Sequence, residues 1–165
     1  MIETYKFRLY PTKEQEVLLA KHFGCVRFIY NWALGYSQTK YKTDGKYLGW
    51  MSIATSQDFK NLKLNNQWLK EVNSQSICNS LGHLGKAFEK FFDHSGGFPK
   101  FKSKHDNQQS FEIPANLKID FKSKKIQIPK FLKTKSSDNR IKFVLSRKVK
   151  HGKIGTATVS RNPSG

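Results

Sequence analysis

The sequence predicts an α+β fold in which a block of four helices interrupts a β-barrel or sheet. Apolar residues between 12 and 95 recur at helical spacing, whereas those after Phe98 alternate with a period of two. One strand-like segment, residues 2–9, precedes the helices and has no partner nearby in the sequence. Its partner is therefore expected among the later strands, so that residues 1–11 and 96–165 form one discontinuous unit around a helical unit of residues 12–95.

The first strand and the first helix are predicted from local signals. Residues 2–9 alternate apolar side chains with Lys6 and Arg8, as in a strand with one packed face and one cationic face. Pro11 ends this strand. Thr12 and Gln15 form a capping box that begins the first helix, and Gly24 is expected to end it.

Three further helices are predicted. A second helix runs from Val26 to about residue 41, and a third begins at a cap on Ser52. A short apolar tether at Trp68 follows the third helix. The fourth helix is capped by Asn73 or Ser74, and its apolar residues at helical spacing are Ile77, Leu81, Leu84, Phe88 and Phe91.

The last third of the chain is predicted to be β-structure. Residues 98–104 alternate Lys and Phe, which suits a strand with one packed and one cationic face. Turn residues follow the strand that ends near Val159, and a returning strand does not follow them, so the final hairpin is expected to be cut short. The other strand-like segments are residues 110–113, 117–120, 126–128, 141–145 and 154–159.

The charge of the chain indicates a polyanionic partner. Thirty Lys and Arg against 12 Asp and Glu give a formal charge of +18, and from Gly96 onward 17 basic residues face 4 acidic ones. Nucleic acid is the expected partner, because such a surface attracts phosphates. A membrane is not expected to be a partner, since no apolar run approaches the roughly 20 residues of a spanning helix. The N-terminus lacks a signal-peptide core, so a cytoplasmic location is expected.

The cysteines and histidines do not suggest a metal site. Cys25 and Cys78 both fall inside helical patterns and are expected to be buried, reduced thiols. The chain has no CxxC pair, and its five histidines show no ligand spacing. Glu89 and Asp93 are spaced i, i+4, but Lys86 and Lys90 flank them, so they indicate a solvated charged face.

Several motifs occur in an order that resembles one known family. The segments are Tyr5 to Thr12, Gly24 to Trp32, Ser80-Leu81 leading to residues 87–92, and Gly97 to Lys102. Together they resemble the N-terminal half of TnpB (OrfB), the insertion-sequence transposase-associated proteins related to type V CRISPR effectors. The resemblance implies a wedge domain, which is an oligonucleotide-binding-like β-barrel, interrupted by a helical recognition domain. It also implies RNA-guided cleavage of DNA beside a short target-adjacent motif.

The chain departs from that family in one respect that bears on activity. The family's RuvC-type nuclease, with three carboxylates and divalent metal, and its zinc ribbon both lie C-terminal to the region that matches here. The chain alone is therefore expected to bind guide RNA and double-stranded DNA without a catalytic residue or a cofactor and without cutting. The missing C-terminal nuclease half is a further expected partner.

The resemblance also assigns the contacts to target-adjacent DNA, whereas the basic side chains themselves indicate the phosphate contacts. Gln75 and Asn79 lie one helical turn apart, and their amides suit the base edges of adenine. The predicted contacts to target-adjacent DNA are Trp50, Ala54, Ser74, Gln75, Cys78, Asn79, Gln109, Ser110 and Phe111. The predicted RNA or phosphate contacts are Lys6, Arg8, Arg27, Lys100, Lys102, Lys104, Arg140, Arg147 and Lys148.

A second function class remains open on the sequence. A stand-alone basic protein, such as a ribosomal-protein-like RNA binder, would show the same composition. A DNA regulator with a helix-turn-helix built from the helices at 13 to 42 is the other form of this alternative. Continuation of the reading frame into a nuclease and a CxxC pair would distinguish the endonuclease portion from the stand-alone protein.

Overall fold

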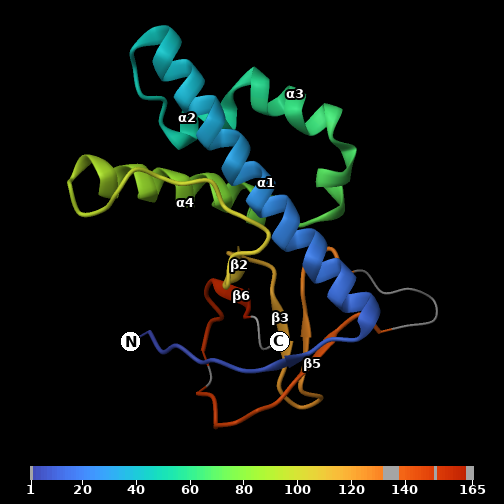
Figure 1. Ribbon diagram of the computed structural model, residues 1–165. Helices are drawn as coiled ribbons and strands as arrows, with labels where there is room; N and C mark the ends of the chain where they lie inside the picture. Colours follow the sequence, from blue (N-terminus) through green and yellow to red (C-terminus); the bar gives the residue numbers. More distant parts are fainter. Residues whose placement is uncertain (1, 132–137, 151, 163–165) are drawn as a thin grey trace.

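The computed structural model describes residues 2–131, 138–150 and 152–162, and its fold class is α+β, as predicted (Figure 1). A long helix runs diagonally through the molecule, with the other helices at one end and the strands at the other (Figure 1). The elements are β1 Leu9–Tyr10, α1 Lys13–Asp44, α2 Trp50–Thr55, α3 Gln57–Asn65, the 3-10 helix η1 Gln67–Glu71, α4 Ser74–Phe92, β2 Gln109–Ile113, β3 Lys118–Asp120, β4 Lys125–Gln127, β5 Ile141–Phe143 and β6 Ala157–Arg161.

Helix α1 is a single uninterrupted helix, so the predicted break at Gly24 is wrong. The predicted capping box at Thr12 and Gln15 is confirmed, and the helix ends at Gly45 with φ +68°. A glycine inside a helix costs about 1 kcal/mol. Burying one large apolar side chain contributes about 1.5–3 kcal/mol, and Phe23, Cys25 and Val26 around Gly24 are all buried. Packing on both sides of Gly24 therefore outweighs its low helix propensity.

The region predicted as the third helix forms two helices. Residue Ser56 is extended, with ψ 152°, and its hydroxyl accepts a hydrogen bond from the backbone N–H of Phe59. Ser56 therefore ends α2 and caps α3, whereas the predicted cap at Ser52 lies inside α2. The predicted tether around Trp68 belongs to η1. The fourth helix is capped by Asn73, one of its two predicted caps.

The strands confirm the predicted long-range pairing of the N-terminus. Strand β1 pairs antiparallel with β5, with Leu9 opposite Phe143, so the chain returns to its first strand after all the helices. The four strands are ordered β1-β5-β4-β3, and β2 pairs separately with β6. The pairings among the described strands do not close a barrel, because β1 and β3 each have one partner in this sheet.

Two predicted strands are shorter or absent. The expected alternation of exposure begins only at Tyr5, because Ile2, Glu3 and Thr4 are all exposed. Within residues 2–9 only Leu9 forms ladder pairs, since β5 is three residues long. Residues 98–104 are irregular rather than a strand. Pro99 is buried there while Phe98 and Phe101 are exposed, so the phenylalanines do not form the packed face expected of a strand. The predicted final turn at 161–165 lies partly outside the described residues.

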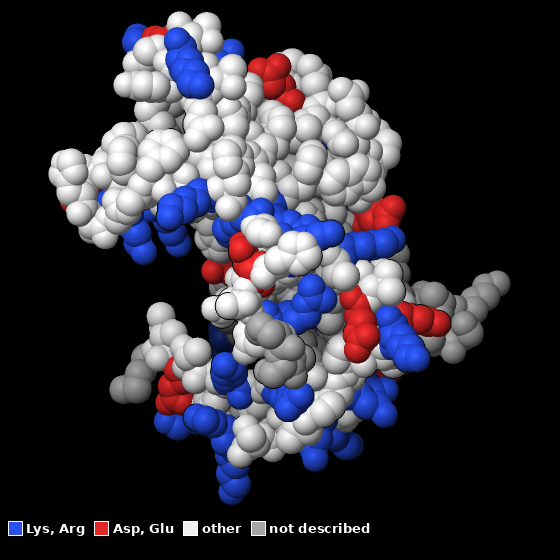
Figure 2. Space-filling view, in the orientation of Figure 1, with Lys and Arg blue, Asp and Glu red and all other residues white. Residues whose placement is uncertain are grey.

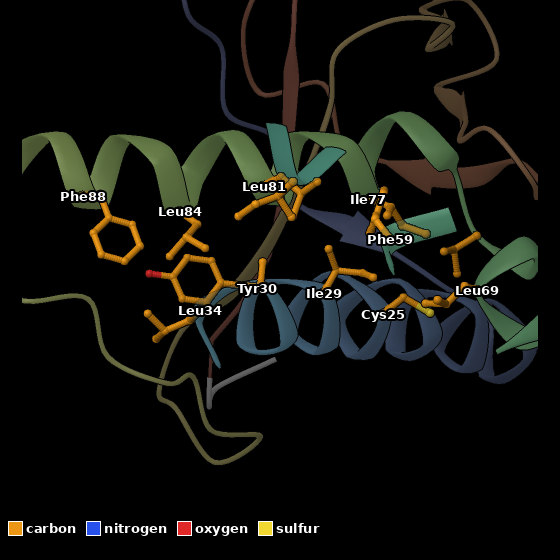
Figure 3. Close-up of a cluster of buried hydrophobic side chains, with 13 residues drawn as sticks. Cys25, Ile29, Tyr30, Leu34, Phe59, Leu69, Ile77, Leu81, Leu84 and Phe88 are labelled. Atoms are coloured by element: carbon orange, nitrogen blue, oxygen red, sulfur yellow. The ribbon is translucent and has the colours of Figure 1, made fainter. Parts of the chain in front are cut away.

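Two clusters of buried residues hold the fold, and α1 contributes to both. In the first, the helical core, Ile29, Tyr30 and Leu34 of α1 meet Ile77, Leu81, Leu84 and Phe88 of α4 (Figure 3). The labelled residues show that the two helices run in the same general direction through this core (Figure 3). In the second, the strand core, α1 packs on the strands. Its buried members are Leu19, Phe23, Val26, Phe111, Ile113, Ile126, Ile128, Phe131, Ile141, Phe143 and Val159.

Buried polar side chains connect the elements around α1. The His22 ring, 1% exposed, lies within hydrogen-bond distance of the Leu18 carbonyl through Nδ1, at 2.9 Å. The backbone N–H of Asn73 donates to Nε2 of His22 over 3.3 Å. This bond requires Nε2 to be the acceptor, so Nδ1 carries the proton. Ser80 of α4 donates to the Val26 carbonyl over 2.7 Å. These bonds fix the start of α4 relative to α1.

Replacing Gly85 by alanine should destabilise the fold. A Cβ at Gly85 would lie 2.2 Å from Cδ1 of Trp50, so the indole would have to leave its place against α4. Overpacking of this kind costs about 1–3 kcal/mol, and urea unfolding followed by circular dichroism measures it. The matched control is Gly82→Ala on the same helix, where nothing lies within 4 Å. That change should stabilise α4 by about 0.5–1 kcal/mol, and equal effects at both sites would contradict the packing of Trp50 on Gly85.

The free energy of unfolding should fall in acid because of His22. Burial lowers the pKa of its ring, so below the ordinary value of about 6.5 the unfolded chain takes up a proton that the folded chain does not. Stability should therefore be constant above that pH and decrease below it. His22→Phe should cost about 1–3 kcal/mol at neutral pH, because the Asn73 N–H loses its acceptor, and should reduce the acid dependence. Urea titrations across this range, with the exposed His105→Phe as control, test it. An unchanged pH slope in His22→Phe would refute the role of His22.

Candidate nucleic-acid interface

Basic side chains are spread unevenly over the surface. Figure 2 shows Lys and Arg gathered on the strand-bearing half and along the side of α4 that faces it, whereas the surface over α2 and α3 is mostly neutral. The molecule is also hollowed below α4, at the left of this view (Figure 2). Phosphates would be attracted to the strand-bearing half and to the hollow rather than to the outer helices.

The segment of residues 98–104, called the strap below, is fastened to the helices by side chains. The Asn31 amide donates to the Lys102 carbonyl over 2.9 Å, and its oxygen accepts from the Lys102 N–H over 2.8 Å. The Phe98 ring packs edge-on against Phe88 and Phe91, with centroids 5.6 and 5.2 Å away. Asn31 thus provides the two hydrogen bonds that a neighbouring strand would otherwise make.

The strap presents cations beside an aromatic ring. Lys100 and Lys104 are exposed, and Phe101 is 57% exposed. The Lys102 ammonium lies 4.2 Å from the centroid of the Tyr30 ring, and desolvation there lowers the pKa of this lysine. Adjacent ammonium groups and an open ring suit contact with phosphates and stacking on a base.

The other predicted phosphate contacts lie on several segments. Lys6 and Arg8 are exposed on the N-terminal segment, and the Arg8 guanidinium lies 5.7 Å from the Tyr10 ring centroid. Arg147 and Lys148 are exposed after β5, whereas Arg27 is half-buried on α1. The structure thus leaves most of these cations open to solvent, but it does not gather them into one site.

Arg140 differs from the other predicted phosphate contacts because it is paired. Its Nη2 lies 2.7 Å from the Asp138 carboxylate, and its Nη1 lies 3.5 Å from Asp120. Hydrogen bonds from Arg140 and then Lys125 lower the pKa of Asp138. A phosphate would therefore have to compete with two carboxylates for this guanidinium.

The predicted DNA contacts lie on three elements that pack together, namely α2, α4 and β2. Ser74, Gln75, Cys78 and Ser110 are exposed, while Trp50 and Ala54 pack half-buried against the helical core. The prediction that Cys78 is buried is wrong, because its neighbour Ile77 occupies the apolar face of α4. The other thiol is buried as expected, and desolvation raises the pKa of Cys25 to about 11.

Three of the predicted DNA contacts already have partners inside the protein. The Asn79 amide donates to the Glu112 carboxylate. The Gln109 oxygen accepts from Arg161 over 3.0 Å, and its nitrogen donates to the Lys104 carbonyl. Phe111, 2% exposed, packs against the His22 and Phe23 rings in the strand core. Gln75 is the predicted amide whose side chain makes no hydrogen bond within the described residues.

Four further residues shape this surface and were not found from the sequence. Asn31 holds the strap, and Arg161 binds Gln109. The other two are Glu112 and His83, whose side chains lie 3.1 Å apart, and Glu112 also contacts Asn79. Asn31 stands between Tyr30 and Trp32 in a predicted helix, and a polar residue in that setting was a signal that it has a partner. The alternation of β2 predicts that Glu112 is accessible, but its partners come from α4, more than 25 residues away in the sequence.

The described residues offer neither a metal-binding cluster nor a membrane-spanning helix. No group of three His, Cys, Asp or Glu side chains there could hold a metal ion. None of the helices in the same part of the chain is long and apolar enough to cross a membrane.

One protein-family model matches the N-terminal part of the chain. The helix-turn-helix domain model of OrfB from IS605 matches residues 1–46. In the structure this range holds β1 and a single helix, α1, which continues to Asp44. The two helices and intervening turn that the description names are therefore not found in residues 2–46.

Three relatives match longer stretches. The chain is 32% identical over 130 residues to "Putative RNA-guided DNA endonuclease InsQ" of Escherichia coli (strain K12), covering 78% of this chain and 32% of that protein. It is 35% identical over 109 residues to "Putative RNA-guided DNA endonuclease" of Streptomyces pristinaespiralis, covering 66% and 27%. It is 31% identical over 119 residues to "Virulence protein VsdF" of Salmonella dublin, covering 64% and 96%. The chain thus spans about a third of the first two relatives.

Replacing Asn31 by alanine should loosen the strap without unfolding the cores. The change removes both hydrogen bonds to the Lys102 backbone, each worth about 0.5–1.5 kcal/mol. Trypsin should then cut after Lys100, Lys102 and Lys104 about tenfold faster, as mass spectrometry of the fragments would show. The control is Asn61→Ala on α3, whose exposed side chain accepts only from Gln57 in the described structure. Equal cleavage of both variants would show that Asn31 does not hold the strap.

Proposed function

Because the chain belongs to the TnpB (OrfB) family of transposon-associated proteins, we propose that it forms the nucleic-acid-binding portion of an RNA-guided DNA endonuclease. In this proposal the strand-bearing half, with β1 joined to the later strands, corresponds to the wedge domain. Helices α2 to α4, with the outer part of α1, correspond to the recognition domain. The portion binds without cutting, because the nuclease and zinc ribbon implied by the family lie C-terminal to the matched motifs.

The observation that carries the proposal is the placement of charge relative to the two halves. On the face that Figure 2 shows, the basic side chains gather on the strand-bearing half and on the facing side of α4. The strap connects α4 to β2 along the chain. We assign the guide-RNA backbone to this surface, since phosphate contacts position a nucleic acid without reading its sequence. The exposed cations Lys100, Lys102, Arg147 and Lys148 support this assignment.

Base contacts to target-adjacent DNA are assigned to the start of α4. Gln75 is exposed, its neighbour Ser76 donates to the Glu112 carbonyl of β2, and Asn79 donates to the Glu112 carboxylate. Gln75 is the better candidate for a bidentate contact with adenine, because the Asn79 amide is already engaged by Glu112. Asn79 could make such a contact only by leaving this carboxylate.

A stand-alone nucleic-acid-binding protein is the second candidate function. The relative VsdF supports it, because the match covers 96% of that protein, so this portion also occurs in a short relative. The helix-turn-helix version of this candidate loses support, because residues 13–42 contain one helix and no turn. A stand-alone protein should bind nucleic acid with full affinity without any nuclease half supplied.

Neutralising Lys100 and Lys102 of the strap and Arg147, which follows β5, should weaken RNA binding. Lys100→Gln, Lys102→Gln and Arg147→Gln should each lower the slope of log K against log salt by about 0.7–0.9 for every phosphate that the variant no longer neutralises. Fluorescence anisotropy of a labelled single-stranded RNA over a salt series measures the slope. The control is Lys60→Gln, which removes one exposed charge from α3, outside the strand-bearing half. If Lys60→Gln lowers the slope as much as the others do, general charge rather than this surface drives binding, and the proposal fails.

A further inference from the structure

A small polar cavity opens beside the β2–β6 pair. It has a volume of about 240 Å³ and is lined by the loop of residues 104–107 together with Gln109, Arg161 and Asn162. Gln109 and Arg161 lie directly opposite each other in the β2–β6 register, 52 residues apart in the sequence. The cavity therefore exists only because the last described strand returns to β2.

Arg161 is held in place at the edge of this cavity. Its Nη2 donates to the Gln109 oxygen over 3.0 Å, and its Cζ lies 5.3 Å from the centroid of the Phe23 ring. Phe23 belongs to the strand core and is 4% exposed, so it provides a rigid support for the guanidinium. In the described part of the chain no carboxylate pairs with Arg161, in contrast to Arg140.

The loop on the other side of the cavity is ordered by its own hydrogen bonds. Ser103 N–H donates to the Asp106 carboxylate over 2.9 Å, and His105 N–H donates to the Ser103 hydroxyl over 3.1 Å. The Gln109 nitrogen donates to the Lys104 carbonyl, so Gln109 connects this loop to Arg161. The lining contains two cations, Lys104 and Arg161, and one carboxylate, Asp106. That carboxylate already accepts a hydrogen bond from the Ser103 N–H of its own loop.

We propose that this cavity binds one phosphodiester group of a nucleic-acid backbone, with Arg161 as the binding cation and Gln109 as the residue that positions it. An arginine fork matches two phosphate oxygens, and a guanidinium already held by an amide and a ring loses little freedom on binding. Both ends of the Gln109 amide are used inside the protein, so Gln109 acts on Arg161 rather than on a base. The inference rests on the proposed nucleic-acid-binding function and adds a particular phosphate site to it.

Three variants test the site in the full chain. Arg161→Gln should lower the salt slope for a single-stranded RNA by about 0.7 and for duplex DNA by about 0.9. Arg161→Lys should keep the slope but weaken binding several-fold, because lysine cannot form the fork. Gln109→Ala should weaken binding several-fold in the natural chain and have no effect in the Arg161→Gln background. The control is Lys60→Gln, an exposed cation of α3 outside the strand-bearing half.

Each result either supports or overturns the site. A reduced slope in RNA, in duplex DNA or in both identifies which backbone occupies the cavity. A slope in Arg161→Gln equal to that of Lys60→Gln, in a protein that unfolds at the natural urea midpoint, overturns the site but leaves the proposed function intact. Absence of any salt-dependent binding by the natural chain overturns both. Inorganic phosphate is the third probe. If it shifts the NMR signal of the Arg161 side chain while Arg161→Gln leaves nucleic-acid binding unchanged, the cavity takes free phosphate and the backbone assignment is overturned.

Discussion

The fold depends on α1 burying two different faces along one uninterrupted length. Its first turns pack Leu19, Phe23 and Val26 into the strand core, and its middle turns pack Ile29 and Leu34 into the helical core. A break at Gly24 would separate these two halves, and the packing around Gly24 prevents it. Because a helix is stiff over this length, the strands and the other helices cannot move independently of each other. The relative placement of the two halves is thus set by one element.

The geometry of the candidate interface depends on this placement of α1. His22 fixes the start of α4 through the Asn73 N–H, and Ser76 of α4 donates to the Glu112 carbonyl of β2 over 2.6 Å. Asn31, further along α1, holds the strap. His22 and Asn31 both lie on α1, so a shift of this helix would displace the start of α4 and the strap together.

Local pairing, rather than the number of basic residues, decides which cations can act on a phosphate. Arg140 is engaged by two aspartates, whereas Arg161 is held by an amide and a ring that leave its charge uncompensated. A guanidinium in the first situation must give up its ion pairs before it binds an anion, and one in the second does not. The sequence alone does not separate them, because the residues that hold Arg161 lie far from it in the chain.

The sequence by itself determined the fold class, the capping box at Thr12, the apolar face of α4 and the return of a late strand to the first one. These follow from periodicity and from hydrogen-bonding groups within a few residues, or from the requirement that an isolated strand find a partner. The position of most exposed lysines was also predictable, since charge is rarely buried. Tertiary structure decided the continuity of α1 through Gly24, the irregular strap in place of a strand, and the division of the strands into two sheets. It also decided the partners of Asn79, Gln109 and Arg161. The reason is physical: each outcome depends on contacts between residues tens of positions apart, whose energies exceed the local preferences of a single glycine, proline or amide.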